Sequence, residues 1–420
     1  MNGEAAVCPQ RRVLLFTQQF VGLGTRKTGM VFWAETFARL GWSTFAVTTQ
    51  LSQLSALLNP QRLAAVAPSE VNRWVPRGPN LTGFVWVPAV HPVAVRSRLV
   101  NAATSFLGDL YARSLPVEIR RIAAQADVIV LESCAAVALF ERLKDINPRA
   151  RIVYCASDRL GAVGMHPTLQ RRLQRTAVLY DLIRVPSQSM AGDFPAGSRV
   201  AHIGHGVDKA ALDARHPSPF TGNRPAAIVG GDMAFDEAIV RHLVEAFPVV
   251  DFHFFGRMDL RRLAGHPNVV IHGEVPFASL VPFMQHADVG IAPYLPRPEL
   301  DYLAQSSLKL HQYTYCRLPT LAPAFARDGR AHIIPYDPSA PGSAVAALVS
   351  ALRFDRTTID RGSVSDWDDV IHELVERLDG LPSFAPLPVR KPLLGASGRS
   401  GSADADAKPM PPVHVEGLGQ

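Results

Sequence analysis

Short apolar runs alternate with helical patterns along most of the chain, and this alternation limits the folds that it can adopt. Val13–Thr17 is an apolar run, a helical pattern follows up to about Leu40, and a second apolar run occupies Ser43–Thr48. Strands that are buried on both faces have this continuous apolar composition, and a helix between two of them makes them parallel. The pattern therefore predicts an α/β fold with parallel sheets.

The alternation occurs in two series, separated by a stretch with two prolines, 209–223, which is predicted to be a linker. Further strands of the first series are predicted at Gly83–Val87, Asp127–Leu131, Arg151–Cys155, Leu182–Pro186 and Val200–Ile203. Those of the second are predicted at Ala226–Val229, Phe252–Phe255, Val269–Ile271, Val289–Ala292, Thr320–Leu321 and Ile333–Ile334. Since 420 residues exceed one ordinary core, we predict two facing Rossmann-like domains with a ligand-binding cleft between them.

The predicted segments are a first domain at 11–210, a second domain at 220–362 and a closing helix at 363–380 that returns to the first domain. The remainder, 381–420, is rich in Pro, Gly, Ser and Ala and is predicted to be disordered. The tail contains Asp404-Ala405-Asp406, but no predicted strand flanks it, so we predict no metal site there. Asp366 and Asp368 are predicted to cap the closing helix rather than to bind a metal ion.

Several functional classes are disfavoured by composition. The chain has no apolar run near the roughly 18 residues of a membrane span, and residues 1–12 carry no signal-peptide apolar region. The four cysteines are scattered without a CxxC pair, which is typical of a reducing cytoplasm and argues against a disulfide framework or a structural zinc site.

Positive charge is concentrated in the first 150 residues, which contain 16 Lys and Arg against 9 Asp and Glu. Within this half, Arg96, Arg98 and Arg113 flank apolar residues at helical spacing. These apolar residues are Leu99, Ala103, Phe106, Leu107, Leu110 and Tyr111. A basic amphipathic helix can lie in a membrane interface, but the same stripe can also pack on a core. Both alternatives stay open, and the charge excess favours the membrane.

The stretch Ser306–Pro319 predicts a helix with an unusual first turn. Ser306 and Ser307 can cap the helix start, Lys309 falls in the first turn with Gln312 three residues later, and Pro319 ends the pattern. A lysine at a helix N-terminus opposes the helix dipole, and an anionic ligand would remove this conflict. We therefore predict a diphosphate site here, with an ordinary surface lysine on a capped helix as the alternative.

Glycine-containing loops follow two other predicted strands. Gly22-Leu23-Gly24 is not a dinucleotide fingerprint, because the third glycine would fall at Lys27 and no acid ends the second strand. Arg26 and Lys27 can instead meet an anionic group, or belong to a solvated loop. His205, between two glycines after Val200–Ile203, is predicted to lie at a strand end where ligands gather.

Ordered motifs over roughly residues 12 to 380 resemble those of one enzyme family. They are Val-His-Pro at 90–92, Asp-Val-Ile-Val at 127–130, Glu132-Ser133, Ala-Ser-Asp at 156–158, Gly-His-Gly-Val-Asp at 204–208, Phe235-Asp236, Gly273-Glu274, Gly-Ile-Ala-Pro-Tyr at 290–294, Tyr302-Leu303-Ala304, Ser306-Ser307, Lys309-Leu310 and Gln312-Tyr313. The chain resembles the xanthan-type bacterial inverting β-1,2-glucuronosyltransferases, which have the two-domain GT-B architecture. No single motif is strong, but their shared order and spacing are.

The resemblance implies transfer of glucuronate from UDP-glucuronate to a mannose of a polyisoprenyl-diphosphate-linked oligosaccharide, in exopolysaccharide biosynthesis. Inversion, no metal and no cofactor besides the donor are implied. The expected partners are the UDP-sugar, the lipid-linked oligosaccharide and an anionic inner-membrane surface, and not nucleic acid. The expected location is peripheral, at the cytoplasmic face of the bacterial inner membrane. A different UDP-sugar donor, or a non-catalytic nucleotide-sugar-binding membrane protein, is the alternative.

The family's functional residues carry over by motif. The aspartate of Ala-Ser-Asp is the general base, which corresponds to Asp158; a sugar hydroxyl needs such a carboxylate to take its proton as it attacks. The donor residues correspond to Met233, Phe235, Glu274, Tyr294, Ser306, Ser307, Lys309 and Gln312. Arg26, Lys27 and His205 are expected in the acceptor cleft, and Arg26, Lys27 and Arg297 are candidates for the donor carboxylate. Membrane contact is expected at Arg96, Arg98, Leu99, Phe106, Leu107 and Arg113.

The chain departs from the family pattern near the expected acceptor and sugar pockets. Cys155 replaces an arginine, Arg159 replaces a glycine, and Gly231-Asp232 replaces a serine with an added residue. Gly29 and Val31 replace an asparagine and a histidine at the start of the first helix. The departures concern the acceptor and the donor sugar, and they leave the predicted diphosphate helix intact.

Overall fold

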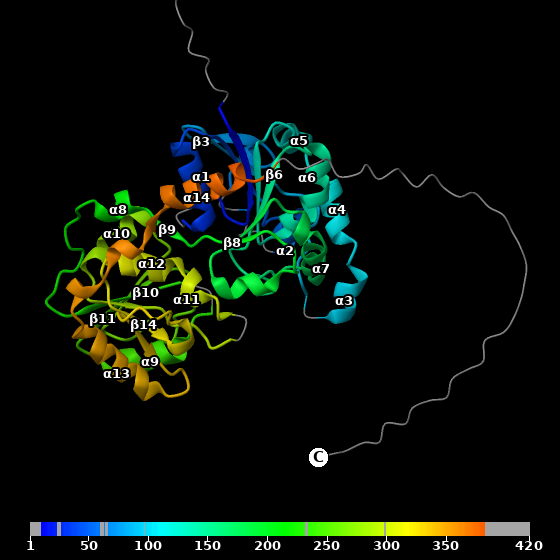
Figure 1. The fold of residues 1–420 in the computed structure, drawn as a ribbon. Coiled ribbons are helices and arrows are strands. Elements are labelled where there is room, and N and C mark those ends of the chain that lie inside the picture. The colour runs from blue at the N-terminus through cyan, green and yellow to red at the C-terminus, as the bar shows by residue number, and fades with distance from the viewer. Residues whose placement is uncertain are drawn as a thin grey trace, which may run out of the picture. The chain divides into compact units, whose positions relative to one another are not determined.

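The computed structural model describes residues 10–22, 27–58, 63, 66–95, 97–231, 234–297 and 300–382. Arg26, Arg96, Met233 and the predicted tail from 383 onward, including Asp404 and Asp406, lie outside the described residues. The described part contains two doubly wound sheets (Figure 1). This confirms the predicted α/β fold with two Rossmann-like domains.

The first sheet has eight strands in the order β3-β4-β2-β1-β5-β6-β7-β8. Their bounds are β1 Arg12–Thr17, β2 Ser43–Thr48, β3 Trp74–Gly78, β4 Leu81–Val85, β5 Val128–Glu132, β6 Arg151–Cys155, β7 Leu182–Val185 and β8 Val200–His202. All pairs are parallel except β3 with β4. The strand order reverses at β1 and β5, so the carboxyl ends of these two strands flank a natural ligand crevice.

The second sheet has six parallel strands in the order β12-β11-β10-β13-β14-β15. Their bounds are β10 Ala226–Gly230, β11 Asp251–Phe255, β12 Val269–Gly273, β13 Val289–Ile291, β14 Thr320–Pro323 and β15 Ile333–Tyr336. Its order reverses at β10 and β13, which forms a second crevice at the carboxyl ends of those strands.

Helices cover both faces of each sheet. In the first half they are α1 Gly29–Arg39, α2 Gln53–Leu58, α3 Arg98–Ala103, α4 Leu107–Arg113, α5 Val117–Ala123, α6 Phe140–Ile146 and α7 Pro167–Thr176. In the second half they are α8 Lys209–Asp213, α9 Glu237–Ala246, α10 Phe277–His286, α11 Leu303–Ser306, α12 Leu308–Tyr315, α13 Pro341–Leu352 and α14 Trp367–Asp379. Figure 1 shows α9 and α13 on one side of the second sheet and α10 and α12 on the other, and the buried residues form matching clusters. Among the described residues, no helix has both the length and the apolar composition to cross a membrane.

The last helix, α14, returns to the first sheet as predicted. Asp366 and Asp369 form a capping box at its start, which satisfies the free backbone N–H groups there. The Trp367 ring stacks on Phe32 of α1 with centroids 5.6 Å apart, and Asp379 pairs with Arg11 at 2.8 Å. These contacts fix the end of the described chain against the helix that follows β1.

Three local predictions from the sequence were incomplete. Strand β3 was not predicted, because Pro76 and Gly78 are uncommon inside a central strand; β3 lies at the sheet edge, where proline is tolerated. The predicted linker contains α8, whose cap is Asp208. The apolar stripe from Leu99 to Tyr111 is not one helix, since it is divided between α3 and α4.

Candidate active site

A cavity of about 200 Å³ lies at the carboxyl edge of the second sheet. Loops after three neighbouring strands contribute to it, because parallel strands end at the same edge. Its lining includes Gly230 at the end of β10, Gly231 in the loop that follows, Gly256 after β11, Glu274 after β12, and Lys309 and Gln312 of α12. Lys27, which directly precedes α1 of the first half, also lines it. The cavity therefore gathers several of the predicted donor residues with one residue from the other half.

Lys309 is held closely against the end of β10. Its ammonium donates a hydrogen bond to the Gly230 carbonyl, and its Nζ lies 4.9 Å from the centroid of the Tyr294 ring. Gly231 has φ +113, and a Cβ there would lie 2.7 Å from Nζ. The backbone conformation thus favours glycine at 231, and the missing side chain leaves room for the lysine ammonium in its present position. An ammonium fixed at the start of α12 suits an anionic ligand in the cavity.

The two serines before α12 do not act as the predicted caps. Ser307 occupies the N-cap position without a side-chain hydrogen bond to the helix backbone; its Oγ lies 2.6 Å from the Tyr294 hydroxyl. Ser306 ends α11, and its buried Oγ has no hydrogen-bond partner among the described residues. The prediction of capping was wrong because tertiary contacts took the Ser307 hydroxyl. The first N–H groups of α12 consequently have no side-chain cap from Ser307.

Other predicted donor residues lie near this edge. Phe235 and Tyr294 form an isolated antiparallel bridge, so the loops after β10 and β13 are adjacent there. Glu274 pairs with Arg257 at 2.6 Å. A carboxylate and two aromatic rings beside a cationic helix start form a set that can hold a base, a ribose and a diphosphate.

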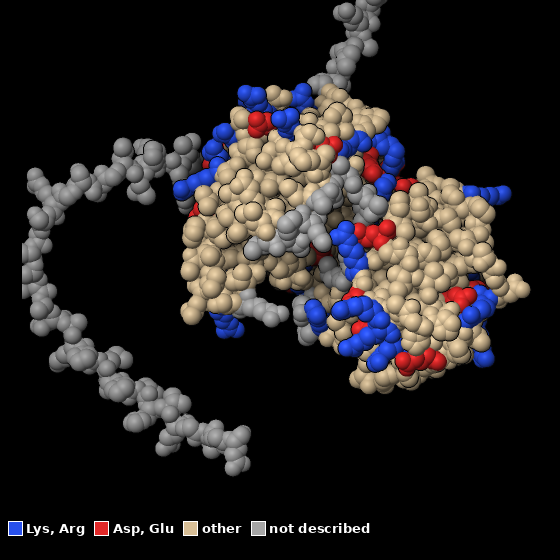
Figure 2. Space-filling model, turned by 180° about the vertical axis from the view of Figure 1, so that it is seen from behind, with Lys and Arg blue, Asp and Glu red and all other residues tan. Residues whose placement is uncertain are grey.

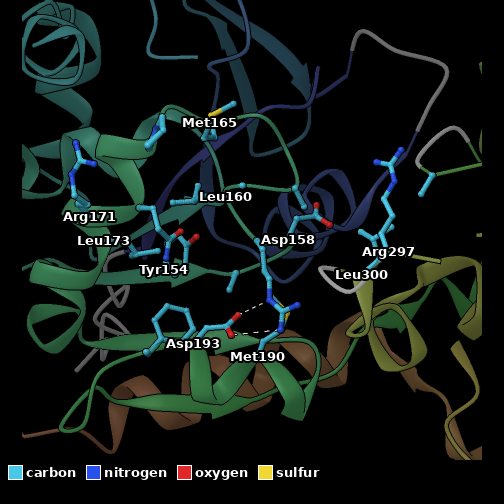
Figure 3. Close-up of a pocket in the computed structure, with 18 residues that line it drawn as sticks. Tyr154, Asp158, Leu160, Met165, Arg171, Leu173, Met190, Asp193, Arg297 and Leu300 are labelled. Carbon is cyan, nitrogen blue, oxygen red and sulfur yellow. Dashed lines mark hydrogen bonds and ion pairs between the residues drawn. The ribbon is translucent and has the colours of Figure 1, made fainter. Parts of the chain in front are cut away.

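A larger cavity, of about 780 Å³, adjoins the carboxyl end of β6 in the first sheet. Asp158 lines it, and Figure 3 shows Asp158 and Arg297 toward one side of the cavity with Arg171 on the other. Much of the remaining lining is apolar, including Leu160, Met165, Leu173, Met190 and Phe194. This cavity can enclose a group with an apolar body and polar ends, with a carboxylate at its edge.

Asp158 is held at two points, its carboxylate and its backbone N–H. The Tyr302 hydroxyl of the second half donates a 2.7 Å hydrogen bond to Oδ1, and the Asp158 backbone N–H donates to the Ser133 hydroxyl at 3.2 Å. Arg159, the next residue, pairs with Asp193 at 2.8 Å and with Asp301 at 2.6 Å. The arginine that replaces the family's glycine thus ties this loop to both halves.

Glu132 is a buried acid for which no role was predicted from the sequence. It ends β5, and its Oε2 accepts hydrogen bonds from the Thr17 hydroxyl at 2.6 Å and the Gln18 N–H at 2.9 Å. Burial raises its pKa to about 7; the two hydrogen bonds oppose this shift, and the charge of Asp158 adds to it. A sequence signal existed, because an acid at the end of a fully buried strand is uncommon.

Glu132→Gln is expected to raise the free energy of unfolding at pH 8 by on the order of 2–3 kcal/mol. The pKa of Glu132 in the folded protein, about 7, exceeds its ordinary value of 4.5, so its contribution to stability is present below pH 4.5 and is lost as pH rises through 7. Glutamine avoids this loss and still accepts both hydrogen bonds. Denaturant unfolding at pH 5 and pH 8 measures the effect. The gain should shrink at pH 5, and the exposed control Glu245→Gln should show none; an equal gain at both pH values would contradict the explanation.

His205 and Lys27 lie in different surroundings. The His205 ring is buried between α14 and α12, with centroids 5.8 Å from Trp367 and 6.2 Å from His311, and it lines neither cavity. Burial lowers its pKa well below the ordinary value. Lys27 pairs with Glu35 at 2.7 Å and lines the smaller cavity. Of His205 and Lys27, only Lys27 lies where a sugar-nucleotide donor could contact it.

Comparisons with known proteins show to which family the chain belongs. Residues 15–186 match the family described as Glucuronosyltransferase GumK, N-terminal domain. A UDP-glucuronate:glycolipid 2-beta-glucuronosyltransferase of Xanthomonas campestris pv. campestris is 32% identical over 293 residues, which are 70% of this chain and 72% of that protein. The chain belongs to the GumK glucuronosyltransferase family.

Solved structures support the GT-B fold of this GumK-family chain. A sucrose-phosphate synthase of Thermosynechococcus elongatus matches with a TM-score of 0.61 and 11% identity, over 88% of this chain and 99% of that one. A trehalose-phosphate synthase of Burkholderia xenovorans matches with a TM-score of 0.55 and 12% identity, over 88% and 100%. At such identities the likeness concerns the fold alone.

Proposed function

We propose that this protein transfers glucuronate from UDP-glucuronate to a glycolipid, with inversion and without a metal ion. More specifically, we propose that the acceptor is a mannose of a polyisoprenyl-diphosphate-linked oligosaccharide and that the process is exopolysaccharide biosynthesis. The name of the Xanthomonas relative supports the donor and the glycolipid acceptor. The observation that carries the proposal is the pairing of two cavities, one lined by Lys309 and the other by Asp158, joined by the short segment between Tyr302 and Lys309.

In the proposed reaction, Asp158 takes the proton of the acceptor hydroxyl as that oxygen attacks the anomeric carbon. The bond between this carbon and the UDP oxygen breaks on the opposite face, which inverts the configuration. The departing UDP gains negative charge, which Lys309 and the peptide dipoles at the start of α12 stabilise. A fixed ammonium against Gly230 and Gly231 is suited to this role because it needs no rearrangement during the reaction.

The direct test supplies UDP-glucuronate and a mannose-terminated lipid-linked oligosaccharide to the full chain. Glucuronate in the lipid fraction, in a β linkage by NMR, is the expected product. Parallel reactions with UDP-glucose and UDP-galactose test the donor. Faster transfer from a neutral sugar would replace the proposed donor, and UDP binding without any transfer would replace the enzyme with a binding protein.

We propose that α3, α4 and the turn between them contact the anionic cytoplasmic face of the inner membrane. Leu99 is 83% exposed and Phe106 57% exposed, with Val100 and Leu110 also on the surface. Arg98 and Arg113 belong to the same two helices. Tyr111 is fully buried in the core and Leu107 is half-buried, so only part of the predicted stripe is available. Figure 2 shows one face of the molecule, on which Lys and Arg form scattered groups. On that face, positive charge alone does not define a docking surface.

The double variant Leu99→Ser with Phe106→Ser is expected to weaken binding to anionic vesicles about tenfold or more, because each lost apolar side chain removes interfacial burial. Co-sedimentation with vesicles containing phosphatidylglycerol or cardiolipin measures it. Val249→Ser with Val270→Ser is a matched control, since both valines are exposed in the second half. Equal binding by the Leu99 and Phe106 variant and the wild type would exclude this surface.

A further inference from the structure

Residues Asp301–Gln305, which we name the coupling segment, extend from the second half and contact four residues of the first half. Asp301 accepts from Arg159 at 2.6 Å, and Tyr302 donates to Asp158 at 2.7 Å. Gln305 Oε1 accepts from the Ser187 hydroxyl at 3.1 Å and the Gln188 N–H at 2.9 Å. Two of these partners are Asp158, the candidate base, and Arg159, the residue after it. The segment therefore contacts the loop after β6 that carries the candidate base.

The tyrosine end of the hydrogen bond to Asp158 is buried, whereas Asp158 itself is half-buried and lines the larger cavity. Tyr302 has no exposed surface, and the guanidinium of Arg159 lies 5.5 Å from its ring centroid. Burial raises the pKa of Tyr302, and the negative charge of Asp158 adds to this shift, so the hydroxyl keeps its proton and acts as the donor. A hydrogen bond to a charged group in a buried site is stronger than one in water.

The same segment leads directly into the predicted donor helix. Backbone bonds from Ser306 N–H to the Tyr302 carbonyl and from Ser307 N–H to the Leu303 carbonyl, at 3.0 and 3.1 Å, keep it helical. Ser307 then contacts Tyr294 at 2.6 Å, and Lys309 follows in the first turn of α12. A short, hydrogen-bonded stretch therefore joins Tyr302, which contacts Asp158, to Lys309, the proposed partner of the diphosphate.

We propose that Tyr302 is a positioning residue for Asp158, and that the coupling segment sets the position of the base from the donor-binding half. The Tyr302 hydroxyl fixes the carboxylate in one orientation and favours its charged form. It exchanges no proton with either substrate. The role rests on the proposed function, because it concerns the base of that reaction.

Tyr302→Phe is expected to lower kcat about tenfold, which is the effect of losing one hydrogen bond to a charged group. The acidic limb of the pH profile of kcat/KM should move to higher pH by about one unit, because the carboxylate loses a donor that favours its charged form. The KM for UDP-glucuronate and the affinity for UDP, from calorimetry, should stay within twofold. A purely structural role would not move the pH profile.

Two further variants make the test specific. Tyr315→Phe removes the 2.8 Å hydrogen bond from Tyr315, at the end of α12, to a different carboxylate, Asp213, and should leave the rate and the pH profile unchanged. Asp301→Asn removes a carboxylate that pairs with Arg159 at a side chain that is 51% exposed, and it keeps the Tyr302 hydroxyl, so it should not move the acidic limb to higher pH. A Tyr302→Phe enzyme that has the wild-type pH profile, even if it is slower or melts earlier, overturns the inference alone. Absence of glucuronate transfer by the wild-type enzyme overturns the proposed function and the inference with it.

Discussion

Asp158→Asn is expected to lower kcat about a thousandfold, within the range of roughly 10²–10⁴ that general-base catalysis contributes. Asparagine has nearly the same shape and can still accept a hydrogen bond from Tyr302, so the cavity edge should keep its geometry. What it lacks is the capacity to take the proton of the acceptor hydroxyl. Initial rates with saturating UDP-glucuronate and lipid-linked acceptor measure the loss, while calorimetry with UDP should give wild-type affinity.

Asp193→Asn is the matched control for this result. Asp193 lines the same cavity, but its carboxylate pairs with Arg159. Its substitution should reduce kcat only a few-fold, through the position of the loop. An Asp158→Asn enzyme that retains more than a tenth of the wild-type rate would remove Asp158 from the role of base, and a larger loss in Asp193→Asn would transfer that role to the neighbouring carboxylate.

Lys309→Met should lower kcat by roughly 10²–10³, the usual cost of losing a group that stabilises developing negative charge. Methionine keeps most of the side chain's length without its ammonium. UDP affinity should also fall, because the diphosphate loses a cationic partner. Lys309→Arg is not expected to rescue the rate, since the ammonium donates at close range to the Gly230 carbonyl and a larger planar guanidinium cannot take up the same position.

Lys209→Met is the matched control for Lys309→Met. Its Nζ lies 5.8 Å from the centroid of the Tyr315 ring, outside the linings of both cavities, and the variant should have wild-type kinetics. Turnover that stops with EDTA and returns with Mg²⁺ would contradict the assignment of the leaving-group charge to Lys309 and the dipole of α12. So would a Lys309→Met enzyme with an unchanged kcat.

Local features of the fold were predictable from the sequence. The buried strands β1, β6 and β10 were predicted to within one residue, because continuous apolar runs bounded by turn residues have few other solutions. Asp236 and Asp366 were placed at helix starts, and both side chains cap there, since capping depends on residues within one turn. The helix-start pattern indicated Lys309 and a family motif indicated Asp158 as candidates, without any knowledge of their surroundings.

The features that the sequence could not supply depend on residues far apart along the chain. Ser307 was expected to cap a helix, but Tyr294 takes its hydroxyl; Tyr302 contacts a carboxylate 144 positions away. The raised pKa of Glu132 arises from burial, which no local pattern measures. Periodicity and capping preferences thus determined the elements and their order, because they act within a few residues. Only tertiary packing, within each half and between them, decided which polar groups meet, because such pairing requires the fold to form first.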